Sequence, residues 1–197
     1  MIKVGLTGSI AVGKSFILDI FKEKYFLPVF NSDNCVRSLY KENSKLINFI
    51  KKEILYTEHN FNNSQIARVV FSDKEKLMKL EGFIHPLVKQ ERKKFISEEM
   101  KKNSDIVIIE IPLLFEKKLE KEVDHIILVR TSKDIQKQRV LKRNGMTEEL
   151  FNKINKRQMA TEDKAKKSDY IIDSYDYDNV TKEVKEIYED IVRKVNA

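Results

Sequence analysis

The chain has 197 residues, of which 41% are hydrophobic and 35% charged, as is typical of a folded domain with a substantial core and not of a disordered chain. No apolar run reaches the length of a membrane span, and the first residues lack the pattern of a signal peptide. The single cysteine, Cys35, excludes an internal disulfide framework and suits a reducing environment, so we expect a cytoplasmic protein. The net charge of +7 suits a polyanionic partner, although much of the lysine is expected on solvated surface.

The first elements are a short β-type segment, a glycine-bounded loop and a helix. Met1–Thr7 reads as a strand, GSIAVGKS follows, and Phe16–Phe21 has apolar residues at helical spacing. The loop fits Gly-x-x-x-x-Gly-Lys-Ser in the strand–loop–helix context that a phosphate-binding loop requires. Its backbone N–H groups and the helix dipole are expected to hold the phosphates of a nucleotide.

The glycines, the lysine and the serine of this loop each have a chemical role in phosphate binding. Gly8 and Gly13 permit a backbone conformation and a close approach that a Cβ would obstruct. Lys14 is expected to reach the outer phosphates, and the Ser15 hydroxyl to bind Mg²⁺. The candidate ATP-binding residues are therefore Gly8, Ser9, Ile10, Ala11, Val12, Gly13, Lys14 and Ser15.

Later apolar runs predict further buried parallel strands, with helical patterns between them. The predicted strands are Leu27–Phe30, Ile106–Ile111, His125–Val129 and Tyr170–Ile172. A terminal amphipathic helix is expected over Asn179–Val195. The sequence thus predicts an α/β fold of three layers, in which helices cover both faces of a central parallel five-stranded sheet.

Two segments interrupt this alternation. Residues 36–104 show helical patterns, with a capping box at Ser72–Glu75 opening one helix and Pro86 starting another. Residues 132–165 are densely basic and helical. A phosphate loop with these two insertions describes a single small-molecule kinase domain, residues 1–197, with an acceptor-side subdomain and a lid.

Two acidic residues lie at or just after the ends of predicted strands, where ligands of such sheets lie. Asp33 comes directly after the second strand and is a candidate general base for an attacking hydroxyl. A turn or helix N-cap is an equally good explanation from this feature alone. Glu110 ends a hydrophobic strand, and because burying an unpaired acid is costly, we expect it to face the site and hold Mg²⁺ directly or through water.

Basic and imidazole side chains complete the candidates. Arg139 and Arg143 stand four residues apart in a helical pattern, so they are expected on one face, where they can stabilise a transferring phosphoryl group. A solvated basic face is the alternative. His85 can bind a phosphate or ribose, or simply pack at a helix start.

Further motifs are spread in order over nearly the whole chain. They are Leu6–Ser15, Asn31–Asp33, Val70–Phe71, Leu80–Glu81, His85–Pro86, Ile111–Glu116, Gln136–Arg143 with Gln158, and Ser168–Asp173. The Pro-Leu-Leu-Phe-Glu stretch and the His-Pro pair are the most selective of them. Together these motifs resemble the dephospho-CoA kinase family.

The resemblance implies a P-loop NTPase fold and ATP-dependent phosphorylation of the ribose 3′-hydroxyl of dephospho-CoA, with Mg²⁺. It implies that Asp33, Lys14 and Arg139 act in catalysis and that Arg139 and Arg143 belong to the lid and bind ATP. Residues 36–104 would hold the acceptor, with Asp33, His85, Leu114 and Glu116 as the substrate-binding residues. The implied partners are ATP and dephospho-CoA, with no nucleic acid or membrane, and the protein would be a monomer or small homo-oligomer.

This sequence departs from the family pattern at several positions. Relatives usually have Asp-Ala-Asp at Asn31–Asp33, Asp at Glu110, an arginine near Asn63–Ser64, and Asn at Ser174. The alternatives are another P-loop nucleoside or nucleotide kinase and a nucleotide-binding homologue without turnover. A phosphate-loop switch or a nucleic-acid-binding NTPase is disfavoured because Phe151 is the single aromatic residue in the basic segment.

Overall fold

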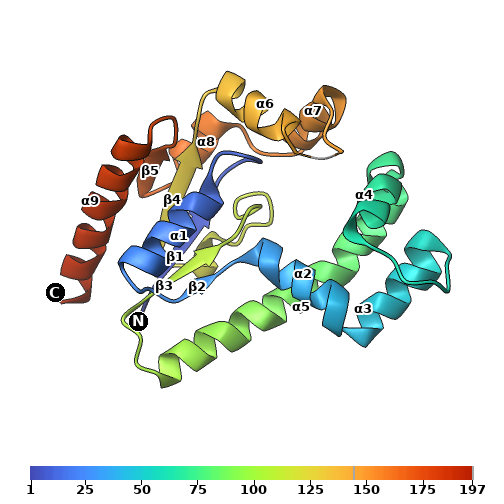
Figure 1. The fold of residues 1–197 in the computed structure, drawn as a ribbon. Coiled ribbons are helices and arrows are strands. Elements are labelled where there is room, and N and C mark those ends of the chain that lie inside the picture. Colours follow the sequence, from blue (N-terminus) through green and yellow to red (C-terminus); the bar gives the residue numbers. More distant parts are fainter. Residues whose placement is uncertain (144, 197) are drawn as a thin grey trace. The chain divides into compact units, whose positions relative to one another are not determined.

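A computed structural model describes residues 1–143 and 145–196 of the chain (Figure 1). The chain forms two compact units, each described by itself. The first, here called the core unit, comprises residues 1–31 and the chain from Ile96 onward. The second, the helical unit, is Ser32–Phe95. The predicted helical insertion, residues 36–104, overlaps the helical unit but overruns its end, because one long helix continues from it into the core unit.

The core unit is built on a parallel sheet, as expected. Within the described residues the sheet has five strands in the order β2-β3-β1-β4-β5, and every neighbouring pair is parallel. All predicted strands are confirmed, although β2 is shorter than the predicted run. The strands are β1 (Ile2–Thr7), β2 (Val29–Phe30), β3 (Ile106–Glu110), β4 (His125–Arg130) and β5 (Tyr170–Asp173).

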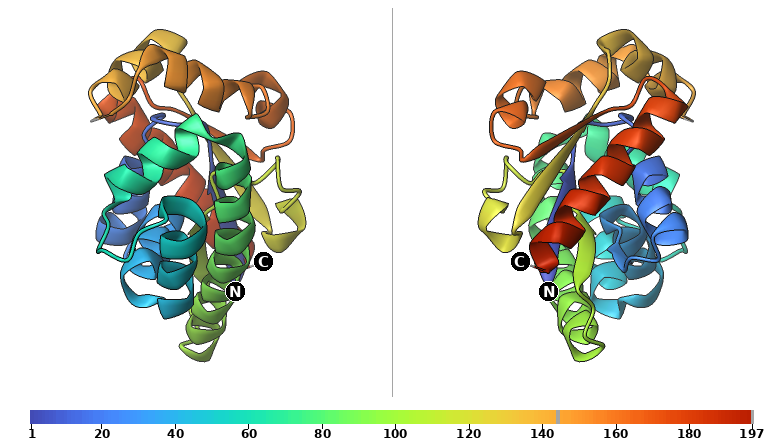
Figure 2. Two further views of the ribbon diagram at one scale, coloured as in Figure 1. Left: turned by 90° about the vertical axis from the view of Figure 1, so that its right-hand side faces the viewer. Right: turned by 90° about the vertical axis from the view of Figure 1, so that its left-hand side faces the viewer.

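Alternate residues of these strands point to opposite faces, because the side-chain period of a strand is two. On one face, Val4 and Leu6 pack with α1 (Lys14–Lys24) and α9 (Tyr177–Val195), which lie against each other (Figure 2). The terminal helix α9 confirms the predicted amphipathic segment. On the other face, a Cβ at Gly5 would lie 3.0 Å from Leu114 Cδ1. The missing side chain therefore leaves room for Leu114, in the segment after β3, to pack on the sheet.

The basic segment 132–165 lies between β4 and β5 and is helical, as predicted. It contains α6 (Lys133–Leu141), α7 (Glu148–Lys156) and α8 (Thr161–Ala165), and Asn144 lies outside the described residues. Ser132 caps α6 and Thr147 caps α7 through their side-chain oxygens. Within the core unit these helices lie at the carboxyl end of the sheet, beyond the phosphate loop (Figure 2).

The helical unit is built from short helices around its own apolar core, which includes Leu46, Ile50, Ile66 and Leu80. The elements of the helical unit are α2 (Ser32–Glu42), α3 (Ser44–Phe49), the π-helical turn η1 (Ile50–Leu55), α4 (Asn63–Ser72) and most of α5 (Lys74–Lys101). The short 3₁₀ turn η2 (Glu120–Glu122) belongs to the core unit.

Two predictions about helix starts are wrong. Ser72 ends α4, and the side chain that caps α5 is Asp73, whose Oδ1 accepts hydrogen bonds from the backbone N–H groups of Glu75 and Lys76. Pro86 lies inside α5 and does not start a helix. The helix continues through it because the apolar stripe is packed on both sides, with Ile84 before it and Leu87 after it.

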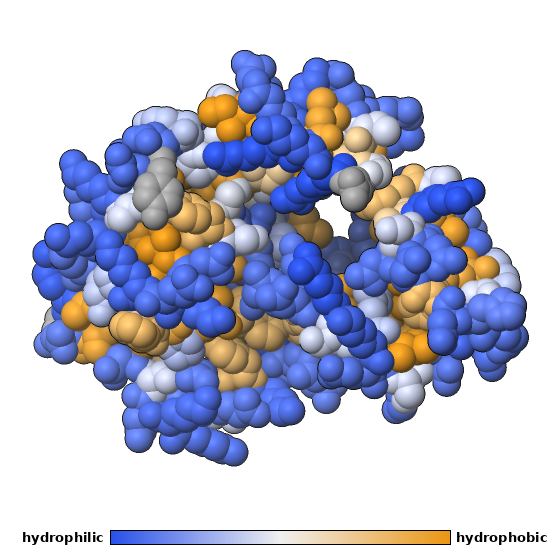
Figure 3. Space-filling view, viewed as in Figure 1, coloured by the Kyte–Doolittle hydropathy of each residue, from blue (hydrophilic) through white to orange (hydrophobic). Residues whose placement is uncertain are grey.

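The surface is largely hydrophilic on the face drawn in Figure 3, in keeping with the 35% of charged residues. Among residues 1–143 and 145–196, no helix combines the length and apolarity that crossing a membrane requires.

Candidate active site: the phosphate loop and its supports

The loop between β1 and α1 has a backbone that requires both of its glycines. Gly8 has φ +148°, and a Cβ there would clash with the carbonyl oxygen of Val129. Gly13 has φ +99°, with Ser174 Oγ 3.3 Å from the position of its Cβ. Ala11 also has a positive φ, +59°, which costs energy for a residue with a Cβ. Only glycine reaches the first two conformations without strain.

Lys14 begins α1 and reaches back over the loop. Its Nζ donates hydrogen bonds to the carbonyl oxygens of Gly8 and Ser9, both at 3.0 Å. The first turn of α1 also directs backbone N–H groups and the positive end of the helix dipole toward this region. The loop therefore offers a cation and oriented donors, the chemistry that phosphate groups require.

The crest of the loop is held by the basic segment. Gln136 on α6 is buried, and its Nε2 donates to the carbonyl oxygen of Ile10 at 2.7 Å. Phe151 of α7 packs in an apolar cluster with Ala11 and Val140. Both α6 and α7 are thus attached to the loop in this structure.

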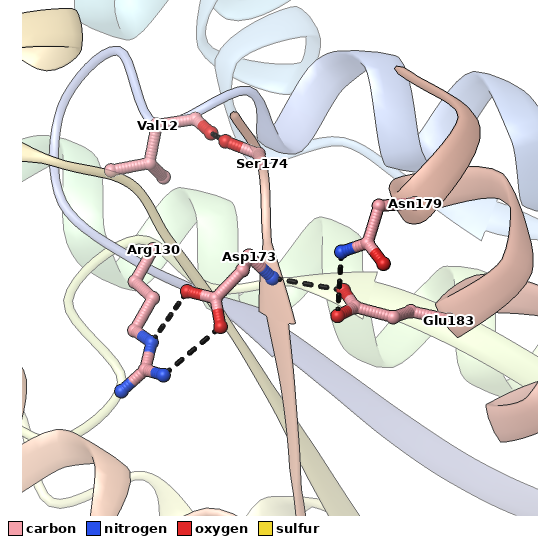
Figure 4. A network of polar contacts seen from close by, with 6 residues as sticks. All are labelled: Val12, Arg130, Asp173, Ser174, Asn179 and Glu183. Atoms are coloured by element: carbon pink, nitrogen blue, oxygen red, sulfur yellow. Dashed lines mark hydrogen bonds and ion pairs between the residues drawn. The ribbon is translucent and has the colours of Figure 1, made fainter. Parts of the chain in front are cut away.

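Arg139 binds the far end of the same loop. Its Nη2 donates to the Ser174 carbonyl oxygen at 2.7 Å, and its Nη1 donates to Ser174 Oγ at 3.1 Å and to the Val12 carbonyl oxygen at 3.4 Å. Ser174 Oγ in turn donates to the Val12 carbonyl oxygen (Figure 4). These contacts place the guanidinium group next to Gly13 and next to Ser174, the residue that follows β5.

Ser174 is fixed by a network between β4, β5 and α9 (Figure 4). Arg130 makes two parallel hydrogen bonds to Asp173, at 2.7 and 3.0 Å, and Asp173 raises the pKa of the Arg130 guanidinium. The Asp173 N–H donates to Glu183, which also accepts from Asn179. The Ser174 N–H donates to the Arg130 carbonyl oxygen at 2.8 Å. This network therefore fixes the position of Ser174, which accepts the hydrogen bonds of Arg139.

Arg143 does not share a helix face with Arg139, and that prediction is wrong. The helix α6 ends at Leu141, and Arg143 lies beyond its C-cap, with its side chain exposed. Gly145, with φ +78°, follows shortly and is typical of a helix end.

Ser15 and Glu110 are the predicted metal ligands, and both belong to the core unit. Glu110 is 1% exposed at the end of β3, paired in register with Leu6 at the end of β1. Ser15 lies in the first turn of α1 and is exposed. A hydroxyl and a carboxylate oxygen suit Mg²⁺, which completes its shell with water and phosphate oxygens. The donor chemistry therefore fits this ion.

The Pro-Leu-Leu-Phe-Glu stretch follows β3. Leu114 is fully buried against Gly5, and its expected role as a substrate-binding residue stays a prediction. Glu116 Oε1 lies 2.8 Å from Lys164 Nζ and accepts the Met159 N–H at 2.9 Å. Burial alone would raise the pKa of the Glu116 carboxyl, but these hydrogen bonds outweigh it and hold the pKa below its usual value.

Asp33 and His85 belong to the helical unit. Asp33 is exposed in the first turn of α2, and His85 is partly buried inside α5. Cys35, on the same helix as Asp33, is a half-buried free thiol whose pKa is raised to about 11, chiefly by burial and further by Glu91. This thiol is protonated at neutral pH and unsuited to nucleophilic chemistry.

A cavity of about 800 Å³ lies in the core unit beside the loop. Its lining includes Ser9 from the phosphate loop, Thr131 from the position after β4, and Gln136 from α6. Residues 158–162, which lead into and form the start of α8, also line the cavity. The cavity is thus enclosed by the phosphate loop and by the segment predicted to be a lid.

Gln136 and Lys164 are buried polar residues of the site that were not predicted from the sequence. Both lie in a basic segment, where polar residues are usually on the surface, and no local pattern marks them as buried. Gln136 is 7% exposed and Lys164 fully buried. Their partners, Ile10 and Glu116, are far away in sequence.

The parallel sheet, the glycine-bounded loop and the helical segment beyond it define a P-loop kinase. A sequence model of the dephospho-CoA kinase family matches residues 2–180, and the chain belongs to that family. It is 39% identical to the dephospho-CoA kinase of Bartonella quintana over 200 residues, which cover 96% of this chain and 98% of that protein.

Solved structures agree in fold. A crystal structure of a Thermus thermophilus protein superposes with a TM-score of 0.78 at 26% identity, covering 96% of both chains. The dephospho-CoA kinase of Campylobacter jejuni gives a TM-score of 0.70 at 24% identity, covering 98% of both chains, and this likeness supports the fold alone.

Proposed function

We propose that this protein transfers the γ-phosphoryl group of ATP to the ribose 3′-hydroxyl of dephospho-CoA and so makes coenzyme A. The observation that carries the proposal is the membership of residues 2–180 in the dephospho-CoA kinase family, together with a phosphate loop of the required conformation. Positioning and charge stabilisation do most of the work in phosphoryl transfer, and this loop supplies both.

The ATP phosphates bind the N–H groups of Gly8–Ser15 in this proposal. Lys14 exchanges its hydrogen bonds with the loop carbonyls for the outer phosphate oxygens. Ser15 and Glu110 would hold Mg²⁺, which neutralises phosphate charge when bound. Arg139 is proposed to act in ATP binding and in catalysis, and Val12 and Ser174 hold its guanidinium group beside the loop. Arg143, exposed beyond α6, is proposed to contact the ATP phosphates.

Asp33 is proposed as the general base and His85 as a contact to the acceptor, both in the helical unit. Asp33 follows β2 by three residues, and ligands of parallel sheets lie outside the carboxyl ends of the strands. Its exposed carboxylate, in the first turn of α2, can accept the proton of the attacking hydroxyl. Residues 132–165 would serve as a lid that excludes water from the phosphates.

A panel of acceptors tests the function. The purified protein is given Mg²⁺ and ATP labelled in its γ-phosphate, with dephospho-CoA, adenosine, AMP or uridine, and labelled products are separated by chromatography. We expect label in coenzyme A only, and none with Lys14→Ala. Transfer to a nucleoside or AMP but not to dephospho-CoA would identify another P-loop kinase. ATP binding without any transfer would identify a homologue without turnover.

A further inference from the structure

Lys164 is a buried lysine in α8, whose other charged residues, Glu162 and Asp163, are exposed. Its side chain has no exposed surface, although it lies in the short helix α8. An ammonium group without water is costly unless an opposite charge compensates it. Glu116, whose side chain is only 13% exposed, provides that charge at 2.8 Å. This pair is therefore maintained by the fold at an energetic cost, unlike the exposed lysine pairs around it.

The carboxylate of Glu116 holds two points of the chain at once. The oxygen that pairs with Lys164 also accepts the N–H of Met159, just before α8. The Lys164 N–H donates to the Ala160 carbonyl oxygen, and Ser168 Oγ donates to the Lys164 carbonyl oxygen. One acidic side chain thus fixes the path of the segment from Met159 to α8.

Glu116 itself stands on a loop that is tied to the strand before the phosphate loop. The Ile111 N–H donates to the Leu6 carbonyl oxygen at 2.9 Å, and Thr7 Oγ1 lies 3.4 Å from the Pro112 carbonyl oxygen. Leu114 packs fully buried on Gly5 of the same strand. The Glu116–Lys164 pair therefore connects α8 to β1, whose last residue, Thr7, directly precedes the phosphate loop.

The anchored residues form a wall of the cavity beside that loop. Met159, Ala160 and Thr161 line this cavity together with Ser9 and Gln136. A displacement of α8 would change the width of this cavity directly. Since a misplacement of about 1 Å can cost about 10² in rate, such a displacement is expected to slow the reaction even though the ion pair itself touches no substrate.

We propose that Glu116 and Lys164 are positioning residues, a buried ion pair that sets the cavity wall formed by residues 159–161 against the phosphate loop for phosphoryl transfer. The inference rests on the proposed function. It gives Glu116 a role different from the acceptor contact that the family resemblance implies.

The test compares Glu116→Gln, Lys164→Met and the double variant in steady-state kinetics with dephospho-CoA. If the residues act as a pair, each single variant lowers kcat by about tenfold or more, with KM for dephospho-CoA within about twofold of wild type. The double variant is then no worse than the worse single one, because both changes break the same interaction. Lys164→Arg, which keeps the charge, retains more activity than Lys164→Met.

A matched control is available on α7. Glu149 and Lys153 form an exposed ion pair at 2.8 Å, so Glu149→Gln and Lys153→Met remove the same chemistry from the surface. We expect wild-type kinetics from both. Thermal melting of every variant shows which are folded at the assay temperature. If Glu116→Gln or Lys164→Met is unfolded at that temperature, Glu116→Asp and Lys164→Arg replace them in the comparison. Glu116→Asp should then lower kcat, because the aspartate side chain is one carbon shorter and does not reach Lys164 in the same way.

Hydrogen exchange tests the anchor without an assay of activity. Exchange in a peptide covering residues 158–165, with Mg²⁺ and ATP present, should rise in both single variants and stay at the wild-type level in the α7 controls. Because this readout needs no acceptor, it remains decisive even if wild type fails to phosphorylate dephospho-CoA. Unchanged exchange and kcat in both anchor variants would overturn the proposal. A large rise in the KM for dephospho-CoA with Glu116→Gln alone would also overturn it and restore the direct acceptor contact.

Discussion

Arg139 and Ser174 are joined by two hydrogen bonds, from Nη2 to the Ser174 carbonyl oxygen at 2.7 Å and from Nη1 to Ser174 Oγ at 3.1 Å. Because Arg139 Nη1 and Ser174 Oγ also reach the Val12 carbonyl oxygen, the same contacts hold one end of the phosphate loop. The serine stands where the family resemblance led us to expect asparagine, and it provides both a hydroxyl acceptor and a donor to the loop. This departure from the family pattern is accommodated by the structure.

Arg139→Ala should weaken ATP binding by about tenfold or more. The substitution removes the hydrogen bonds that hold one end of the phosphate loop and removes a cation proposed to bind ATP. A hydrogen bond to a charged group contributes about 1.5–3 kcal/mol, and about 1.4 kcal/mol corresponds to a factor of ten. Isothermal titration calorimetry with Mg²⁺ and ATP, without acceptor, measures the dissociation constant. Lys142→Ala, at the exposed C-cap of α6, is the control and should bind like wild type. Equal dissociation constants for Arg139→Ala and wild type would contradict this role.

Gln136→Leu should lower both the stability and the ATP affinity of the protein. The substitution removes the donor to the Ile10 carbonyl oxygen and leaves a part-buried acceptor without that bond, at a cost of up to about 1–3 kcal/mol. Urea unfolding gives the loss of stability, and titration calorimetry gives the affinity. Gln138→Leu, two residues away and exposed, is the matched control. If both leucine variants change the free energy of unfolding equally, the Ile10 contact is not the cause.

Asp33→Asn should lower kcat by about 10² or more while ATP binding stays unchanged. Asparagine keeps the size of the side chain but cannot accept the hydroxyl proton, and general base catalysis typically contributes about 10²–10⁴ in rate. Steady-state kinetics and ATP titration separate the two effects. Asp19→Asn changes an exposed acid of α1 in the same way and should be neutral. Near-wild-type kcat in Asp33→Asn would remove Asp33 from the role of base.

Cys35 should resist alkylation in the folded protein. Its pKa of about 11 leaves about one thiolate in a thousand at pH 8, against about one in four for an ordinary thiol with pKa near 8.5. Iodoacetamide labelling followed by mass spectrometry should be at least about a hundredfold slower than in urea. Because the pKa is raised, the folded-state rate should keep rising about tenfold per pH unit until pH approaches 11. Equal rates in the presence and absence of urea would show an ordinary, accessible thiol.

Much of the fold was predictable because its signals are local. The strands are short β-branched runs, and GSIAVGKS combines a loop pattern with its strand and helix in consecutive residues. The failures come from tertiary packing. Pro86 reads as a helix start, but α5 continues through it because Ile84 and Leu87 keep one apolar stripe packed. Arg143 has the right spacing from Arg139, but α6 ends first at Leu141.

The candidate site was predictable only in part for the same reason. The loop residues are identified by adjacency in sequence, whereas Gln136 meets Ile10 and Lys164 meets Glu116 only after folding. The burial of Leu114 is likewise not visible in its motif, because its side chain fills the room that Gly5 leaves on the sheet.

The position of the transferred phosphate tests the account most directly. Dephospho-CoA is incubated with Mg²⁺, ATP and the protein, and the product is examined by phosphorus NMR with correlation to the ribose protons. We predict one new phosphomonoester resonance coupled to H3′, absent with Lys14→Ala. A phosphate coupled to H2′, or no new resonance from a preparation that binds ATP, would contradict the proposed reaction.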